Sequence, residues 1–346
     1  MSLPNNKVVQ DDLWKVYNNL VETDKQIAAV LEQLKDDGLY DSTMIVFYAD
    51  HGGPLPRQKR LIYDSGLKVP MIIKFPNNQH AGSKDDQLIS FIDFAPTTIK
   101  FAGGSIPSHM HGKDFIGSVK NLKAKQDKRK YIHAAADRFD GFTDTIRAVR
   151  DDRFKYIRNY RPEQGYYLPV SYRERIPTMN NLLSQRDAGK LNDVQMQWFR
   201  TQKPIEELFD TQNDPHELNN LAQDPSYQSK LVRFRAELAR WLAEVGDQPG
   251  LPEAQLIKKL WNGQDQQPIT ATPKLILNDR KVEIKSETQG AVISYQILSD
   301  TNAKSNLWIL YRQPLSISAD TQIKVIAHRI GYVPSEEVIK VIKLNG

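Results

Sequence analysis

The chain has 346 residues, of which 40% are hydrophobic and 26% charged, a composition typical of a globular protein with two or three domains. It contains no cysteine, which excludes disulfides, zinc–thiolate sites and a cysteine nucleophile within these residues, and no run of eighteen apolar residues that could span a membrane. The net charge of +5 comes from interspersed basic and acidic residues, so a mixed solvated surface is favoured over a nucleic-acid surface.

The first hundred residues alternate between helical and strand patterns. Apolar residues at helical spacing predict an amphipathic helix over 11–37. The β-rich runs 43–49 and 69–75 are uninterrupted, which is typical of strands buried on both faces. Asp93 is a favourable N-cap for a further helix. We therefore predict that residues 8–105 form part of an α/β sheet covered by helices.

A smaller α+β subdomain is expected over 106–246. Two apolar runs within 146–157 flank the turn Asp151-Asp152 and predict a β-hairpin. A short strand is expected at 207–210, and an amphipathic helix at 226–245.

The last part of the chain changes character twice. Residues 247–272 are rich in Pro, Gly and Gln, which predicts a linker. From 273 to 346 short β-rich runs are separated by turn residues, the pattern of a small β-sandwich.

A candidate site follows the first strand. Asp50 and His51 come directly after the run 43–49, and Gly52-Gly53 lets the backbone bend there. A carboxylate and an imidazole at the end of a sheet strand suit a divalent cation, although a simple polar turn is the alternative. Arg57 and Lys59 follow in a basic loop, and together with a cation they could neutralise a tetrahedral oxyanion.

Five segments in this order resemble the sulfatases of the alkaline phosphatase superfamily, and the resemblance covers about residues 8–245. Each segment alone is a weak signal, but five in the family's order make a chance match improbable. They are LYDSTMIVFYADHGG (39–53), KRLIYDSGLKVPMIIKFP (59–76), LISFIDFAPTTIKFAGGSIP (88–107), MHGKDF (110–115) and ELFDTQNDPHELNNLA (207–222).

The resemblance implies roles for the residues of the candidate site. Asp50 and His51 would ligate the family's Ca²⁺, although some members have Asn at the position of His51. Lys59 would contact the sulfate group and stabilise the leaving oxygen. Arg57 lies close enough along the chain to touch substrate, which is an inference from its position and not a motif match.

Three further residues are candidates for substrate binding, with an ordinary solvated side chain as the alternative in each case. His111 stands in the MHGKDF loop, where substrate contact is favoured over a metal role for the pair His109 and His111. Asp137 and Arg138 lie in a segment expected to be a loop before the hairpin. In sulfatases this region reaches the mouth of the pocket and can select the sugar.

The family's chemistry requires a formylglycine, made from Cys or Ser within a Cys/Ser-x-Pro-Ser-Arg signature. These residues contain no cysteine and no Ser-x-Pro-x-Arg. The chain is therefore expected to be the C-terminal portion of a longer enzyme, to need an N-terminal sulfatase segment as its partner, and to be inactive alone.

The resemblance thus predicts a sulfuric ester hydrolase that removes sulfate from a carbohydrate. A hydrolase of phosphate or phosphonate esters from the same superfamily is one alternative, and a non-catalytic sulfoglycan-binding fragment is another. The family also suggests a periplasmic or secreted location, although the first residues lack the apolar core of a signal peptide.

Overall fold

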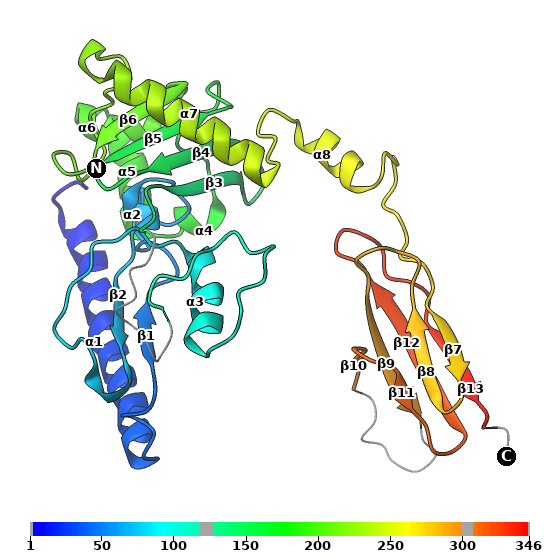
Figure 1. Cartoon of the computed structure of the whole chain (residues 1–346). Coiled ribbons are helices and arrows are strands. Elements are labelled where there is room, and N and C mark those ends of the chain that lie inside the picture. The colour runs from blue at the N-terminus through cyan, green and yellow to red at the C-terminus, as the bar shows by residue number, and fades with distance from the viewer. Residues whose placement is uncertain (1–2, 118–127, 299–306, 345–346) are drawn as a thin grey trace. The chain divides into compact units, whose positions relative to one another are not determined.

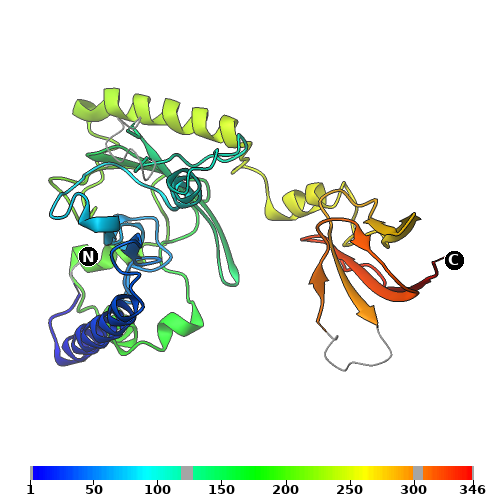
Figure 2. The ribbon, with the colours of Figure 1, turned by 60° about the horizontal axis from the view of Figure 1, so that its bottom comes forward.

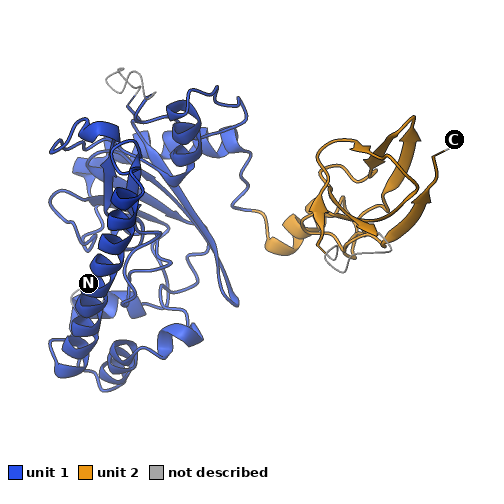
Figure 3. Ribbon diagram, turned by 90° about the horizontal axis from the view of Figure 1, so that it is seen from below, with its two compact units in different colours: residues 1–250 blue, residues 251–346 orange. Residues whose placement is uncertain are grey.

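The computed structural model describes residues 3–117, 128–298 and 307–344. The chain divides into two compact units, residues 1–250 and 251–346 (Figure 3). Among the described residues, no helix has both the length and the apolar character needed to cross a membrane. The finer division into four segments stays a prediction.

Unit 1 begins with the long helix α1 (Lys7–Asp36), which confirms the helix predicted over 11–37. The side chain of Asn6 caps its first turn by accepting the N–H of Val9 at 3.2 Å. Gly38 follows the end of the helix with φ +68°, a left-handed conformation that glycine adopts without strain.

The two predicted apolar strands are β1 (Ile45–Tyr48) and β2 (Met71–Lys74), and they pair antiparallel with Phe47 opposite Ile72. The prediction that both faces are buried is wrong for these residues, since Phe47, Tyr48 and Ile72 are all exposed. The physical reason is that, among the described residues, each strand pairs only with the other.

Helix α3 (Phe94–Phe101) follows the 3₁₀ turn η2 (Phe91–Asp93) and confirms the helix predicted there. Asp93 does not cap α3 with its side chain, which corrects the expectation for this residue. The turn begins three residues earlier, so Ser90 is the capping residue and the Asp93 carboxylate accepts its N–H at 2.9 Å. The short helix α2 (Asp64–Leu67) lies between β1 and β2, and the 3₁₀ turn η1 (Pro76–Asn78) follows β2.

A four-stranded antiparallel sheet forms the centre of unit 1, in the order β3-β4-β5-β6 (Figure 1). It confirms the predicted hairpin and the strand at 207–210. The loop expected around Asp137 is wrong: this segment is a strand with an irregular register between Ala136 and Arg138. Both faces of this strand are only partly buried, so it carries charged residues and lacks the apolar pattern typical of a strand. The strands are Ile132–Phe139, Phe142–Arg150, Phe154–Asn159 and Glu206–Asp210.

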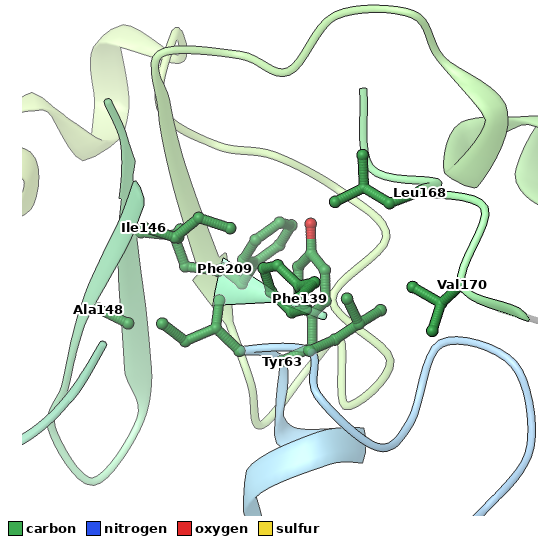
Figure 4. Packing of buried hydrophobic residues seen from close by; sticks show 10 residues of the cluster. Tyr63, Phe139, Ile146, Ala148, Leu168, Val170 and Phe209 are labelled. Atoms are coloured by element: carbon green, nitrogen blue, oxygen red, sulfur yellow. The ribbon is translucent and has the colours of Figure 1, made fainter. Parts of the chain in front are cut away.

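The two faces of this sheet are covered by different parts of the chain. Helix α7 (Gln228–Val245) lies along one face, as Figure 2 shows. Its residues Leu231, Phe234 and Leu238 are buried against the sheet. The segment 61–63 packs on the opposite face (Figure 4). It follows the loop 52–60, called here the Lys59 loop. Burial of this apolar surface on both faces stabilises the sheet and fixes the base of that loop.

The remaining helices of unit 1 lie between the hairpin and β6, except for one 3₁₀ turn that follows β6. Helix α5 packs against α1, where the buried carboxylate of Asp12 accepts both the N–H and the hydroxyl of Thr178 at 2.8 Å. The elements are α4 (Ser171–Glu174), α5 (Pro177–Asp187), α6 (Asp193–Met196), η3 (Gln197–Phe199) and, before α7, η4 (Pro225–Tyr227).

Unit 2 contains helix α8 (Glu253–Leu260), within the segment predicted as a linker, and two antiparallel sheets. The sheet orders are β10-β9-β12-β13 and β11-β8-β7, and buried residues of both sheets form one hydrophobic cluster. The strands, in chain order, are Lys274–Asn278, Lys281–Lys285, Val292–Leu298, Ile309–Leu310, Leu315–Ser316, Thr321–His328 and Val338–Ile342.

Candidate active site

Asp50 and His51 lie together just beyond the end of β1. The imidazole Nε2 of His51 is 3.3 Å from a carboxylate oxygen of Asp50, and the Asp50 side chain is 82% exposed. The other ring nitrogen, Nδ1, is 2.7 Å from the carbonyl of Gly52, which can only accept a hydrogen bond. Two donor atoms therefore face the same place, as a cation would require.

The loop after His51 folds back on itself. The N–H of Gly52 donates to the carbonyl of Gly66 at 2.9 Å, and the N–H of Lys59 donates to the carbonyl of Gly53 at 3.1 Å. A β-carbon at Gly52 would lie 1.9 Å from the Ser65 carbonyl oxygen, so only glycine fits there. This closure brings the Asp50-His51 turn and the Lys59 loop onto one scaffold.

Lys59 is half-buried, and its ammonium has no hydrogen-bond or ion-pair partner in the part of the chain that the structure describes. A lysine can bury its stem and keep the ammonium accessible, so this group is available to a ligand. An unpaired lysine on the loop that follows two candidate ligands is a suitable receptor for an anion.

The guanidinium of Arg57 is directed to the backbone of a distant segment. Its two terminal nitrogens donate to the carbonyls of His216 and Glu217 at 2.7 and 2.8 Å. The group also lies over the ring of Tyr63, 4.1 Å from the ring centroid. Arg57 has a left-handed backbone with φ +61°, held in part by the Ser65 hydroxyl, which donates to its carbonyl at 2.6 Å. These contacts tie the Lys59 loop to the segment that follows β6.

A buried charge cluster, made of Asp64, Lys155 and Glu217 with Arg150 at its side, supports the same loop. The Lys155 ammonium lies 2.7 Å from Asp64 and 2.9 Å from Glu217, and it donates to the Ile62 carbonyl at 3.0 Å. Burial acts to raise the pKa of Asp64, but Lys155 and Arg150 outweigh it and hold that pKa below its ordinary value. For Glu217 burial dominates and raises the pKa.

A second buried group lies under the loop. The Tyr63 hydroxyl donates to Glu207 at 3.0 Å, and the side-chain amide of Asn159 donates to the other carboxylate oxygen at 2.8 Å. Burial raises the pKa of both Tyr63 and Glu207. Sequence reasoning did not identify these two clusters. The one sequence signal for the first cluster was Lys155, a lysine within the apolar strand 154–157. A buried cation needs carboxylate partners, so this lysine indicated that acidic side chains lie nearby.

His111 lies in a loop that is fixed next to η2. The N–H of Lys113 donates to the Asp93 carboxylate at 2.8 Å, and a β-carbon at Gly112 would lie 1.8 Å from the Ile92 carbonyl oxygen. The adjacent Phe91 has its ring 5.6 Å from that of Tyr48, which stands two residues before Asp50. A chain of contacts therefore links the exposed His111 loop to the end of β1.

Asp137 and Arg138 lie on β3, in different surroundings. The Asp137 carboxylate is paired with Arg147 on β4 at 2.7 Å, and the same guanidinium also pairs with Asp247 at 2.6 Å. Arg138 is exposed near the turn between β3 and β4, where its guanidinium donates to the Asp140 carbonyl at 3.2 Å.

The β3–β4 turn is connected to the Lys59 loop. The carboxylate of Asp140 accepts a hydrogen bond from Arg60 at 2.8 Å, and Arg60 is the residue next to Lys59. The structure thus brings Arg138 and Lys59 to connected loops, while Asp137 is engaged in its own ion pair.

The described residues hold no group of three or more His, Cys, Asp or Glu side chains that could ligate a metal ion. Asp50 and His51 supply two donors. The carboxylate fits Ca²⁺, which prefers six or more oxygen ligands, whereas an imidazole nitrogen is a less usual ligand for that ion. The pair fits part of a cation site.

Comparison with known proteins gives the class of this fold. The family model described as "Sulfatase" matches residues 6–104, and the model "N-sulphoglucosamine sulphohydrolase, C-terminal" matches residues 57–198. The first match includes the Asp50-His51 turn and Lys59, and the second begins at residue 57 and includes Lys59. Both models describe sulfatases, which confirms the resemblance given by the sequence motifs.

Individual relatives agree with this class. An ulvan-active sulfatase of Formosa agariphila is 56% identical over 336 residues, which are 97% of this chain and 56% of the relative's length. The N-sulphoglucosamine sulphohydrolase of Homo sapiens is 24% identical over 265 residues, 71% of this chain and 50% of its own length. Residues 6–198 therefore belong to the sulfatase family.

A solved structure supports the fold assignment. The crystal structure of yidJ from Bacteroides fragilis, assigned as a sulfatase, matches with a TM-score of 0.51 and 23% identity, over 72% of this chain and 46% of that one. The chain spans about half the length of the curated relatives it matches.

Proposed function

We propose that this chain is the C-terminal portion of a sulfatase that removes sulfate from a carbohydrate. One observation carries the proposal: the hydrogen bond between Gly52 and Gly66 places a two-donor turn and an unpaired lysine on the same closed loop. A cation and an ammonium side by side suit a sulfate group, whose oxygens share the negative charge.

The residues of the loop have distinct proposed roles. Asp50 and His51 hold the cation, which when bound neutralises charge on the sulfate oxygens. Lys59 donates to the sulfate group and stabilises the oxygen that leaves with the carbohydrate. Arg57 and Asp137, whose side chains are engaged within the protein, position the loop and the sheet. His111 and Arg138, which are exposed, contact the carbohydrate directly.

The proposal assigns the nucleophile to a different segment. A formylglycine requires a Cys or Ser signature that these residues lack, and the relatives are nearly twice as long as the part that matches. An N-terminal sulfatase segment would supply the nucleophile and the remaining calcium ligands. Two donors bind calcium weakly, so without that segment the chain is inactive.

The substrate class follows from the relatives. The relative with 56% identity is named an ulvan-active sulfatase, and its match extends through both units of this chain. We propose ulvan as the substrate to test first. A polymer of this kind is met outside the cytoplasm, in accordance with a periplasmic or secreted enzyme.

The test is a chimera that joins this chain to the part of the Formosa agariphila relative that it does not match. Release of sulfate from ulvan, at a rate well above that of the chain alone, is the expected result. A chimera that is folded but releases no sulfate from any sulfated carbohydrate contradicts the proposal and favours a non-catalytic sulfoglycan-binding role.

A phosphate-ester hydrolase is a second candidate, because the multifunctional alkaline phosphatase superfamily protein PehA of Trinickia caryophylli is 25% identical over 238 residues. The same chimera decides between them. Faster turnover of an aryl phosphate than of the matching aryl sulfate would support this candidate.

A further inference from the structure

Unit 1 exposes apolar side chains on its first helix and on the β1–β2 ribbon. On α1, Trp14 and Tyr17 are each 67% exposed and Leu20 is 57% exposed. On the ribbon, Ile72 is 65% exposed and lies directly opposite Phe47, which is 38% exposed. Scattered exposed apolar residues are ordinary, but a cluster of large ones marks a surface that another molecule covers.

The burial of α1 is confined to its beginning. The helix has 30 residues, and its buried residues are Val9 and Asp12, both in the first two turns. Beyond them the apolar stripe continues through Tyr17 and Leu20 to Val30, without a buried residue. A helix of this length spans about 45 Å, and most of its stability normally comes from packing of the apolar stripe. Beyond its first two turns α1 is therefore only partly covered in the described chain, with Val16 and Ile27 half-buried and Leu20 and Val30 exposed.

The β1–β2 ribbon lies next to α1. Side chains alternate along a strand, so Ile72 and Lys74 share one face of β2. The Lys74 ammonium donates to the carbonyl of Tyr40, just beyond α1, and lies 4.2 Å from the Tyr40 ring centroid. The exposed pair Phe47 and Ile72 therefore faces the side on which α1 ends, and Figure 1 shows α1 next to β2.

The edges of the ribbon are open as well. Among the described residues β1 and β2 pair only with each other, so the outer edge of each strand has free backbone N–H and C=O groups. A ribbon of two strands is marginally stable in water, and an open apolar edge readily accepts another strand. Further strands are thus the natural covering for this face.

The size of the exposed surface agrees with a large partner. The accessible surface of the chain is 21838 Å². A folded protein of this size is expected to expose about 17,000 Å², even when the two units are counted as separate bodies. An obligate complex buries about 2,000–5,000 Å² in total, so each partner contributes about half of that area, and the excess is large enough for such a contribution.

We infer that the α1 stripe and the β1–β2 ribbon form one docking surface for the polypeptide that corresponds to the unmatched part of the sulfatase relatives. This inference rests on the proposed function and adds the surface through which the two parts join. The relative with 56% identity matches 97% of this chain but only 56% of its own length. The remaining polypeptide has the size to add strands to the ribbon and to cover the α1 stripe.

The test is co-expression of this chain with the unmatched part of the Formosa agariphila relative, followed by sedimentation velocity of the purified material. The expected result is a one-to-one complex. Tyr17→Lys and Ile72→Lys should each weaken the complex at least tenfold. Val232→Lys, at a residue of α7 that is 60% exposed, is the matched control and should leave the complex unchanged.

Three results would overturn the inference: no complex, a complex that the two variants do not weaken, or self-association of this chain that Tyr17→Lys abolishes. Thermal unfolding of each variant in the absence of the partner shows that its fold is intact, because both side chains are exposed in the chain. Sulfate release is measured separately. A complex without hydrolysis leaves the docking surface in place and contradicts only the proposed function.

Discussion

The backbone N–H of Gly52 donates to the carbonyl of Gly66 at 2.9 Å, and neither residue has room for a β-carbon. A β-carbon at Gly66 would lie 2.2 Å from the Leu61 carbonyl oxygen. Gly66→Ala should therefore open the Lys59 loop, lower the free energy of unfolding by about 2 kcal/mol and lower turnover of the chimera at least tenfold. Urea denaturation and sulfate release measure the two effects.

Gly250→Ala is the control for that substitution. A β-carbon there would meet no atom within 4 Å, so stability and turnover should both be unchanged. If Gly66→Ala behaves in the same way, the loop closure is not needed for the site.

Lys155 is expected to be the most sensitive buried side chain in this region. Lys155→Met keeps the apolar stem but leaves the buried Glu217 without its cation, while Asp64 keeps only its pair with Arg150. Loss of about 3–5 kcal/mol of stability is expected at neutral pH. The triple change to Met, Asn and Gln at 155, 64 and 217 should recover a large part of this loss. Failure of the triple variant to recover stability would show that the ammonium acts mainly through the Ile62 carbonyl.

Glu206 should make the protein sensitive to acid. Hydrogen bonds from Arg235 and Tyr156 outweigh burial and lower the pKa of Glu206 from 4.5 to about 2. Because the folded state binds the proton less tightly, this contribution is complete above pH 4.5 and is lost as pH falls towards 2. At its largest it is about 3 kcal/mol. Denaturation between pH 5 and 2 should show a shallower loss in Glu206→Gln than in the parent, and identical slopes would contradict the assignment.

His133 should make the stability of the protein depend on pH near neutrality. Its ring stacks on Trp241 at 4.8 Å and bonds Glu237 at 2.9 Å, but burial prevails and lowers the pKa of His133 below 6.5. The folded state thus favours the neutral ring, so its contribution is present above pH 6.5 and declines as pH falls. His133→Phe should flatten the loss of stability between pH 7 and 5. His109→Phe, at an exposed loop residue, should retain the parent's slope.

Substitutions at the site itself test the proposed roles in the chimera. Asp50→Ala and Lys59→Ala should each lower turnover by a factor of about 100 or more, with the thermal unfolding curve unchanged. His51→Asn should retain substantial activity at saturating calcium, because an amide oxygen replaces the imidazole nitrogen. Near-normal rates for Asp50→Ala would remove it from the set of ligands.

Local elements of the fold were predictable from sequence. The helix α1, the strands β1 and β2, the hairpin and α7 all follow periodicity and turn residues that act over a few positions. The strand that carries Asp137 was not predictable, because its charged residues obscure a weak alternation and its register is irregular. The burial expected for β1 and β2 was wrong, since burial depends on neighbouring strands that a local pattern does not specify.

Prediction of the candidate site was limited in the same way, because a local pattern does not specify contacts between distant residues. Asp50, His51 and Lys59 are close in sequence, so motif spacing was enough to nominate them. The contacts of Arg57 with the segment that follows β6 and the cluster around Lys155 join residues far apart in the chain. Their partners could be identified only once the fold had brought them together.

The contacts of Arg57 also set an order of events during synthesis. Its two acceptor carbonyls lie 159 and 160 positions further along the chain. A ribosome that has just completed the Lys59 loop has not yet made the carbonyls that anchor it, and such distant contacts form late and slowly. The loop therefore reaches its final shape only after β6 and the turn behind it have emerged. A product that ends before residue 216 would carry every proposed ligand and the lysine, yet it would lack the anchors that arrange them.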